Sequence, residues 1–187
     1  MSITLTSPFP PEHVPLLWSW LHQFPQYNFD DSQPRDAQEL EAMIWWRQED
    51  GEVIWEVKLD DLPVGAIGYK KLTPEEGLFR GICFTSSVHG LGIAYYAVSQ
   101  ALNIAFRDGT QVVKAEFFAH NYRIQKLLEK LGGTVSDYIT CGSIQNGKLI
   151  DWKVVEITQL DYLRSYQEYL ANPQSILSPE DIPAIGG

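Results

Sequence analysis

The sequence predicts an α/β fold of the α+β kind, in which helices cover both faces of a mixed sheet of about six to seven strands. Apolar strand patterns at 79–84 and 112–119 are each followed by a helical pattern, which is typical of parallel strands. Strand pairs within 52–69 and 137–157 are joined by turn residues and indicate antiparallel hairpins. Parallel and antiparallel strands together make the predicted sheet mixed.

The N-terminal region predicts one strand and two helices. A strand at 3–8 alternates apolar residues with threonine, and apolar residues at helical spacing follow at 10–23. A second helix is expected to start near Ser32 or Pro34 and to end at Gly51. Four tryptophans in these helices either pack against the sheet or form an aromatic wall for an acceptor substrate: Trp18, Trp20, Trp45 and Trp46.

Glycines mark special positions in both hairpins. Gly65 and Gly68 lie inside the second strand of the first hairpin, where glycine indicates a bulge or a closely packed neighbour. The strands 137–145 and 148–157 of the second hairpin are joined by Asn146-Gly147, a dipeptide suited to a turn with two positive φ angles. A last helix is expected at 161–171.

The centre of the chain carries a glycine motif between a strand and a helix. His89-Gly90-Leu91-Gly92-Ile93-Ala94 follows strand 79–84 and opens a helix that runs to Phe106. Strand 112–119 then leads to a short helix for which Asn121 is a suitable N-cap. The first amides of a helix lack carbonyl partners and lie at the positive end of the helix dipole. Because glycine has no side chain to block them, the motif predicts a phosphate-binding helix start.

Length and charge limit the classes of function. With 187 residues, the chain is expected to form one domain at 1–171, followed by a tail at 172–187. A formal net charge of -10 argues against nucleic-acid binding, which depends on clustered Lys and Arg. The same charge favours the approach of cationic acceptors such as polyamines or basic protein termini.

The two cysteines, Cys83 and Cys141, fall in separate predicted strands without the spacing of a metal site, so we expect neither a disulfide framework nor a bound metal. The N-terminus lacks the pattern of a secretory leader, and no apolar run approaches the length of a membrane span. We therefore expect a cytoplasmic protein that does not bind membranes.

The central motifs resemble those of the GNAT superfamily of acyl-CoA-dependent N-acyltransferases, and most closely the type that acetylates ribosomal-protein N-termini. That superfamily carries Arg or Gln, two variable residues, Gly, one variable residue, and Gly or Ala between a strand and a helix. Here the motif is His89-Gly90-Leu91-Gly92-Ile93-Ala94, and a later block from Asn121 to Leu131-Gly132 also fits. The resemblance covers about 53–157 and implies a sheet that is splayed in its middle.

The resemblance implies acetyl-CoA as cosubstrate, without a metal. The helix start would hold the pyrophosphate of coenzyme A, and the backbone at Phe84 would bond the pantetheine arm and polarise the thioester carbonyl. Asn121 would contact the same arm. The implied cofactor-binding residues are Phe84, His89, Gly90, Leu91, Gly92, Ile93, Ala94, Asn121 and Lys126, and the implied catalytic residues are Glu116 and Phe84.

Glu116 is the candidate general base, because ribosomal-type members carry a glutamate at the same spacing before the Asn. The alternative is a surface glutamate that faces solvent or pairs near Lys114. The need for a base depends on the acceptor. A lysine amine with a pKa of about 10.4 costs roughly 4.6 kcal/mol to deprotonate at pH 7, and an α-amine costs about 1 kcal/mol.

Two positions depart from the family pattern. Leu128 occupies the place of a tyrosine that protonates the leaving thiolate in many members, so water, Ser87, Tyr95 or His120 would have to replace it. His89 replaces the usual Arg or Gln, and it carries a charge only when it is protonated.

The sequence therefore supports an N-acetyltransferase that acts by direct attack of a primary amine on acetyl-CoA. The amine belongs either to a small molecule or to a protein N-terminus. The alternative is a module that binds acyl-CoA without turnover. An acyl group larger than acetyl and a homodimer formed through a sheet edge both remain open.

Overall fold

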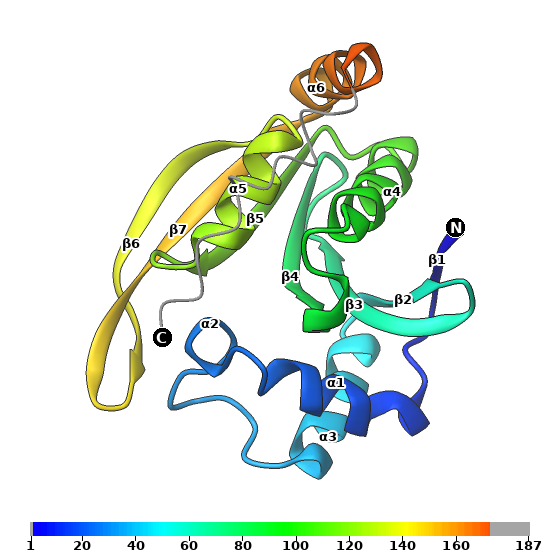
Figure 1. Cartoon of the computed structure of the whole chain (residues 1–187). Coiled ribbons are helices and arrows are strands. Elements are labelled where there is room, and N and C mark those ends of the chain that lie inside the picture. The colour runs from blue at the N-terminus through cyan, green and yellow to red at the C-terminus, as the bar shows by residue number, and fades with distance from the viewer. Residues whose placement is uncertain (1, 173–187) are drawn as a thin grey trace.

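A computed structural model describes residues 2–172, and the predicted tail from residue 173 onward lies outside the described residues. The described chain forms one seven-stranded sheet in the order β1-β2-β3-β4-β5-β7-β6 (Figure 1). Only β4 and β5 pair in parallel, so the mixed sheet predicted from the sequence is confirmed. The strands are β1 (Ile3–Thr6), β2 (Val53–Leu59), β3 (Leu62–Lys71), β4 (Glu76–Phe84), β5 (Val112–Phe118), β6 (Thr134–Gln145) and β7 (Lys148–Thr158).

The helices follow the predicted order, with two differences in the N-terminal region. The start of the second predicted helix is Asp36, not Ser32 or Pro34, because the Asp36 carboxylate accepts the Glu39 amide at 2.8 Å and caps the helix. A short helix also forms within the turn segment that precedes it. The helices are η1 (Pro11–His13), α1 (Val14–Leu21), α2 (Pro25–Asn28), α3 (Ala37–Glu49), η2 (Ser86–Val88), α4 (Ile93–Arg107), α5 (Tyr122–Lys130) and α6 (Gln159–Ala171).

The glycine positions of both hairpins behave as predicted. The register between β3 and β4 shifts at Gly68, and a Cβ added there would collide with the Glu52 carboxylate. A Cβ added to Gly65 would lie 2.6 Å from the Cys83 carbonyl oxygen. The turn between β6 and β7 has φ angles of 51° at Asn146 and 72° at Gly147. These glycines therefore mark close packing within the sheet and a tight turn at its edge.

The two faces of the sheet carry separate cores. On one face, α4 packs through alanines that let it approach closely, and α5 and α6 complete the same core. On the other face, α1 and α3 pack against the sheet through Leu17, Trp20, Leu40 and Ile44. Trp20 is buried, whereas Trp45 and Trp46 are 63% and 59% exposed, so the packing interpretation holds for Trp20 and fails for that pair.

The sheet opens in its middle, as the family resemblance implies. The parallel register between β4 and β5 runs from Glu76 opposite Val112 to Phe79 opposite Ala115 and then stops. The remaining residues of both strands, through Phe84 and Phe118, diverge (Figure 1). A gap between two central strands leaves backbone groups without a neighbouring strand, so this opening is the natural place to look for a ligand.

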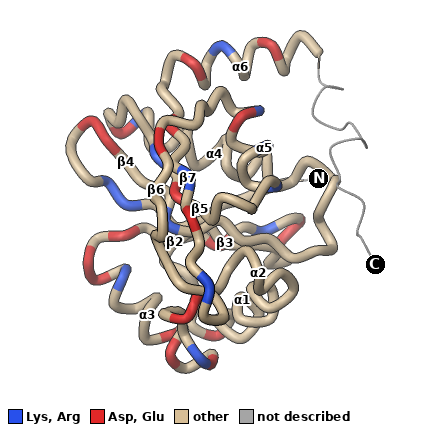
Figure 2. Tube along the Cα trace, turned by 90° about the vertical axis from the view of Figure 1, so that its left-hand side faces the viewer, with Lys and Arg blue, Asp and Glu red and all other residues tan. Residues whose placement is uncertain are grey.

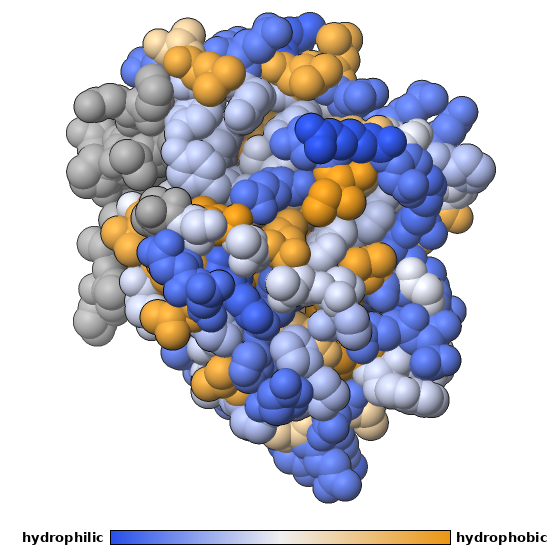
Figure 3. Space-filling model, turned by 90° about the vertical axis from the view of Figure 1, so that its right-hand side faces the viewer, coloured by the Kyte–Doolittle hydropathy of each residue, from blue (hydrophilic) through white to orange (hydrophobic). Residues whose placement is uncertain are grey.

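The surface carries mixed charges and scattered apolar groups. In Figure 2, basic and acidic residues are interspersed along the trace. Figure 3 shows hydrophobic residues as separate patches among hydrophilic ones on the face that it presents. Within residues 2–172, no helix has the length and apolar character that a bilayer crossing requires.

Candidate active site

Two left-handed glycines shape the start of α4. Gly90 and Gly92 have φ angles of 78° and 74°, a conformation that other residues adopt only with strain. Gly92 is the N-cap, and its carbonyl accepts the first intrahelical hydrogen bond, from the Tyr96 amide at 3.2 Å. The amides of the first turn of α4 therefore precede the first intrahelical bond and point out of the helix end. This arrangement fits a diphosphate group.

The amide of Leu91 is already engaged, because it donates to the Val88 carbonyl at 3.3 Å. The amides that face a ligand at the helix start are then those of Gly92, Ile93 and Ala94. Leu91 itself is 53% exposed, whereas Ile93 is fully buried and anchors the turn in the core. We call the segment from Val88 to Ala94 the cradle.

His89 and Arg123 meet beside the cradle. Nη1 of Arg123, on α5, lies 3.2 Å from Nδ1 of His89, and both groups lie against the Phe24 ring, the guanidinium at 4.6 Å and the imidazole at 5.0 Å. Desolvation and the Arg123 charge lower the pKa of His89, although a backbone hydrogen bond with Phe84 acts in the opposite direction. The positive charge at this position therefore belongs to Arg123, and exposed Lys126 lies one turn further along α5.

The backbone of β4 faces the gap at the position that the resemblance assigns to Phe84. The Thr85 amide donates to the Val64 carbonyl on β3 at 2.9 Å. Because antiparallel ladders alternate, the peptide groups of Phe84 and Ile82 point the other way, toward the side from which β5 has separated. An extended ligand could pair with β4 there as an added strand.

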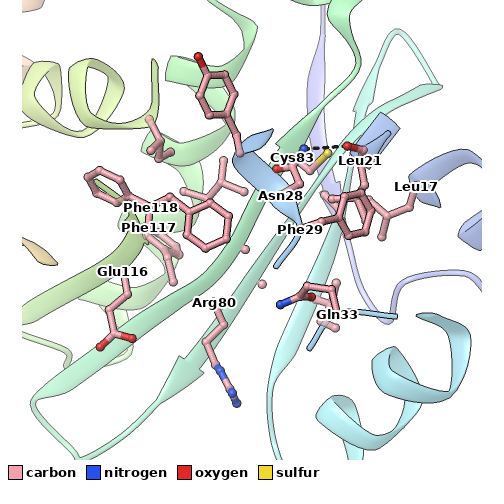
Figure 4. Close-up of a pocket in the computed structure, with 18 of the residues that line it drawn as sticks. Leu17, Leu21, Asn28, Phe29, Gln33, Arg80, Cys83, Glu116, Phe117 and Phe118 are labelled. Carbon is pink, nitrogen blue, oxygen red and sulfur yellow. Dashed lines mark hydrogen bonds between the residues drawn. The ribbon is translucent and has the colours of Figure 1, made fainter. Parts of the chain in front are cut away.

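A cavity of about 210 Å³ lies where the two strands diverge (Figure 4). Most of its wall comes from β4, β5, α1, α3 and the connection between α2 and α3, and α2, β2, β3, β7 and the start of α5 complete it. The polar lining includes Gln33, Arg80, Glu116 and Asn121, and the aromatic lining includes Tyr27, Phe29, Phe117, Phe118 and Trp152. None of Trp18, Trp20, Trp45 and Trp46 lines it, so the aromatic wall predicted from the sequence is built from other residues.

Glu116 is exposed on β5 and lines this cavity. Lys114, two residues earlier, pairs with Glu76 and Glu156 and leaves Glu116 alone. Across residues 2–172, no hydrogen bond or ion pair engages the Glu116 carboxylate. An unpaired carboxylate at the cavity can accept a proton from a bound amine, and the general-base role of Glu116 stays a prediction.

Asn121 both caps a helix and lines the cavity. Its side-chain oxygen accepts the Ile124 amide at 3.3 Å, which starts α5 at the end of β5. Since an asparagine amide also carries two N–H donors, its nitrogen can bond a ligand while the oxygen caps the helix. The predicted contact with a pantetheine arm is compatible with this geometry.

The candidates for a general acid all lie away from the cavity lining. Leu128 is fully buried, and Tyr95 faces α6, where desolvation raises the pKa of its hydroxyl. His120 places Nε2 2.8 Å from the Gln26 carbonyl, and Ser87 lies on the exposed η2 turn. The sequence also carried no signal for Arg80, Gln33 or Tyr27, because these come from a bulge, a loop and the short helix α2, none of which carries a motif.

Cys83 lines the cavity but is not poised as a nucleophile. Its side chain is buried, and desolvation raises the pKa of the thiol to about 12. A thiol attacks carbonyl groups as thiolate, and this one stays protonated at neutral pH. Within residues 2–172, no cluster of three or more His, Cys, Asp or Glu side chains could hold a metal ion.

Solved structures with the same fold include several acetyltransferases. Spermidine N-acetyltransferase from Vibrio cholerae, in complex with CoA and spermine, superposes with a TM-score of 0.73 at 18% identity, covering 86% of this chain and 98% of that one. Ribosomal-protein-alanine N-acetyltransferase from Brucella melitensis gives 0.68 at 14% identity, covering 84% and 99%. A protein from Salmonella typhimurium solved with acetyl-CoA gives 0.67 at 14%, covering 84% and 94%. These superpositions show a shared fold, and at such low identities they show the fold alone.

No curated protein sequence matches the chain significantly. A family model described as the acetyltransferase (GNAT) domain matches residues 4–134. The match includes the cradle, both diverging strands and the start of α5, which are the elements that form the site described above. The chain therefore belongs to the GNAT acetyltransferase family and is an acyltransferase.

Proposed function

We propose that the protein transfers the acetyl group of acetyl-CoA to a primary amine by direct nucleophilic attack. The observation that carries this proposal is the opening between β4 and β5, which has the cradle beyond the end of β4 and a cavity with an unpaired carboxylate along the diverging strands. The fold that it shares with enzymes named for acetylating spermidine and ribosomal-protein alanine supports an amine acceptor.

The residues present fit coenzyme A. Amides of Gly92, Ile93 and Ala94 would hold the diphosphate, with Arg123 and Lys126 adding positive charge from α5. The outward-facing peptide groups of β4 would pair with the pantetheine arm. When bound, acetyl-CoA supplies an activated carbonyl and a thiolate leaving group.

The protein's part in the reaction is to position the amine and to move a proton. Glu116 accepts a proton from the ammonium form of the acceptor, and the free amine then forms a C–N bond to the thioester carbonyl as the C–S bond breaks. The nitrogen of the new amide loses its second proton to water, and Glu116 returns its own proton to solvent. The Phe84 amide would stabilise the oxyanion. Because a thiol pKa is about 8.5, the sulfur can leave as thiolate and take its proton from water, so Leu128 is no obstacle.

Glu116→Gln tests the proposal. We expect kcat/KM for acetyl transfer at pH 7 to fall by about 100-fold or more, because a general base typically contributes 10²–10⁴. The deficit should shrink as the pH rises toward the amine pKa, where the acceptor loses its proton without help. Affinity for CoA should stay unchanged, since Glu116 lies outside the cradle.

Glu168→Gln, at an exposed position on α6, is the matched control and should behave like the native protein.

The main competing function is a module that binds acyl-CoA without turnover. Stabilisation by CoA in a melting experiment, with no thiol released from acetyl-CoA by any amine in a broad panel, would establish that module instead.

A further inference from the structure

Arg80 is a cation with little compensation at the wall of the cavity. Buried Glu52 is held by Arg47, whose Nε donates to Oε2 at 2.8 Å and whose Nη2 donates to Oε1. Nη1 of Arg80 is 3.6 Å from the same Oε2, beyond hydrogen-bond distance. Arg47 thus makes both close contacts with the Glu52 carboxylate. Two guanidinium groups, those of Arg47 and Arg80, therefore face a single carboxylate.

The surrounding charges do not cancel this surplus. Asp50, whose pKa also responds weakly to the Arg80 charge, pairs with Lys70, and this pairing is the main cause that lowers the pKa of Asp50. Two carboxylates therefore face three cations: Arg47, Lys70 and Arg80. This group of five side chains therefore keeps one excess positive charge in the wall of the cavity, although the whole protein has a net charge of -10. The net charge governs the long-range approach of a substrate, whereas this local charge acts on a substrate that has bound.

A β-bulge directs Arg80 into the cavity. The register pairs Gly68 with Gly81 and Tyr69 with Phe79, which leaves Arg80 as the extra residue on β4. Bulges change the direction of a side chain and are common beside active sites. The Arg80 carbonyl accepts a hydrogen bond from Nη2 of Arg47 at 3.0 Å, and this bond holds the bulge in place. The Arg80 side chain is 38% exposed.

Glu116 stands across the opening from Arg80. Phe79 and Ala115 are the last parallel pair, so Arg80 and Glu116 are the first residues of the two diverging strands. Figure 4 shows both side chains extending in the same direction, with the Gln33 amide pointing toward them. Because the strands separate here, no ion pair joins the two groups within the described residues. The cavity thus offers one anion and one cation to a ligand.

We propose that the acceptor is a compact zwitterion, a primary amine that carries a carboxylate or a similarly small anion within a few bonds. The ammonium group binds Glu116 and passes its proton there, and the anion binds the Arg80 guanidinium, which suits a carboxylate geometrically. The cavity of about 210 Å³ is smaller than the pockets of about 300–1,000 Å³ that hold drug-sized ligands, which favours a small acceptor. This inference rests on the proposed function and specifies its substrate class.

The test compares matched acceptors. Free amino acids, including leucine, phenylalanine, β-alanine and γ-aminobutyrate, are each assayed beside their carboxamide and decarboxylated amine, together with spermidine and peptides. At least one free amino acid should show a kcat/KM about 30-fold or more above both of its uncharged-end analogues, because the analogues leave Arg80 unpaired. Equal or faster turnover of the decarboxylated amines, of spermidine or of peptides would overturn the inference and leave the proposed acetyl transfer intact.

Arg80→Gln provides the second arm. The preference for the zwitterion should fall to within about threefold of unity, through loss of activity on the amino acid and not through a gain on the amine. Arg80→Lys should keep part of the preference, and Arg35→Gln, an exposed control paired with Glu39, should keep all of it. A preference that survives in Arg80→Gln would refute the assignment, and melting without ligand checks that the variant is folded.

A binding readout separates the two proposals. In the presence of CoA, the preferred amino acid should raise the melting temperature of the native protein but not that of Arg80→Gln. If this stabilisation occurs without any acetyl transfer, the acceptor assignment stands and the proposed catalysis fails. If no amino acid stabilises the protein or is acetylated, the acceptor assignment is wrong.

Discussion

The cradle and the cavity belong to one opening between β4 and β5 but are built in different ways. The cradle is one continuous run, Val88 to Ala94, whose shape comes from two left-handed glycines and a helix start. The cavity is assembled from five strands, four helices and the loop between α2 and α3, which are far apart in the chain. In the proposed function, cosubstrate binding would therefore be encoded locally, whereas acceptor choice would depend on tertiary packing.

Gly92→Glu should have the largest effect on CoA binding, because it changes the cradle itself. The new carboxylate would stand where the diphosphate binds, and the backbone would be strained at a φ of 74°. Losing two charge-assisted hydrogen bonds at about 2 kcal/mol each predicts a roughly 1,000-fold weaker CoA affinity, measurable by calorimetry.

Gly109→Glu is its control, at the opposite end of the same helix. Gly109 has a φ of 90° and open space around it, so the variant suffers the same backbone strain without touching the cradle. It should lose some stability and keep its CoA affinity. If both variants bind CoA equally well, the phosphate site lies elsewhere.

Gly68→Ala tests the packed wall of the cavity, and its expected effect is the second largest. Its Cβ would collide with the Glu52 carboxylate, which Arg47 holds from both oxygens and which cannot move away cheaply. Disturbing a buried ion pair predicts a loss of about 3 kcal/mol in the free energy of unfolding, measured by urea denaturation.

Gly81→Ala, on the neighbouring strand β4, meets no atom within 4 Å. Its unfolding free energy should stay the same or rise by up to about 1 kcal/mol, because alanine restricts the unfolded chain. Comparable losses at both glycines would mean that the two walls do not differ in packing.

The local elements could be predicted from the sequence because each depends on a few neighbouring residues. Asn146-Gly147 predicted the turn between β6 and β7, and Asn121 predicted the cap of α5. Gly90 and Gly92 predicted the start of α4. The glycines of β3 indicated close packing, although not the partners against which they pack. The opening in the sheet followed from the family resemblance, since the register at which two parallel strands separate leaves no local pattern.

The acceptor side could not be predicted in the same way. The Arg80 bulge depends on how β3 and β4 pair, and Gln33 and Tyr27 reach the cavity only because the α1–α3 region folds over it. The start of α3 was misplaced because Ser32 and Pro34 are also good start signals, and only the Glu39 amide bond identifies Asp36 as the cap. Glu116 was found through its spacing from Asn121, but its lack of partners required coordinates.

His89, within the cradle, offers a smaller test. Desolvation and the Arg123 charge lower its pKa, so the folded state favours the neutral ring. Its contribution to stability is then complete above pH about 6.5 and declines as the pH falls through the lowered pKa. Arg123→Gln should raise the pKa of His89 part of the way back in an NMR titration, and Arg164→Gln should leave it unchanged.

Coenzyme A should act in the opposite direction to Arg123. A bound diphosphate favours the protonated ring, so CoA should raise the pKa of His89 in the native protein. A titration that does not respond to CoA would place the diphosphate away from this imidazole.

Cys83→Ala should have the smallest effect on catalysis, although Cys83 lines the cavity. The thiol, with a pKa of about 12, would have to ionise to carry an acetyl group, so attack by the amine itself is the easier route. We expect kcat/KM within about threefold of native, a modest loss of stability from the emptied space, and intersecting initial-rate lines for acetyl-CoA and amine. Parallel lines, or abolished transfer in a folded Cys83→Ala protein, would instead indicate an acetyl-cysteine intermediate and would move the chemistry from the acceptor's amine to the wall of the cavity.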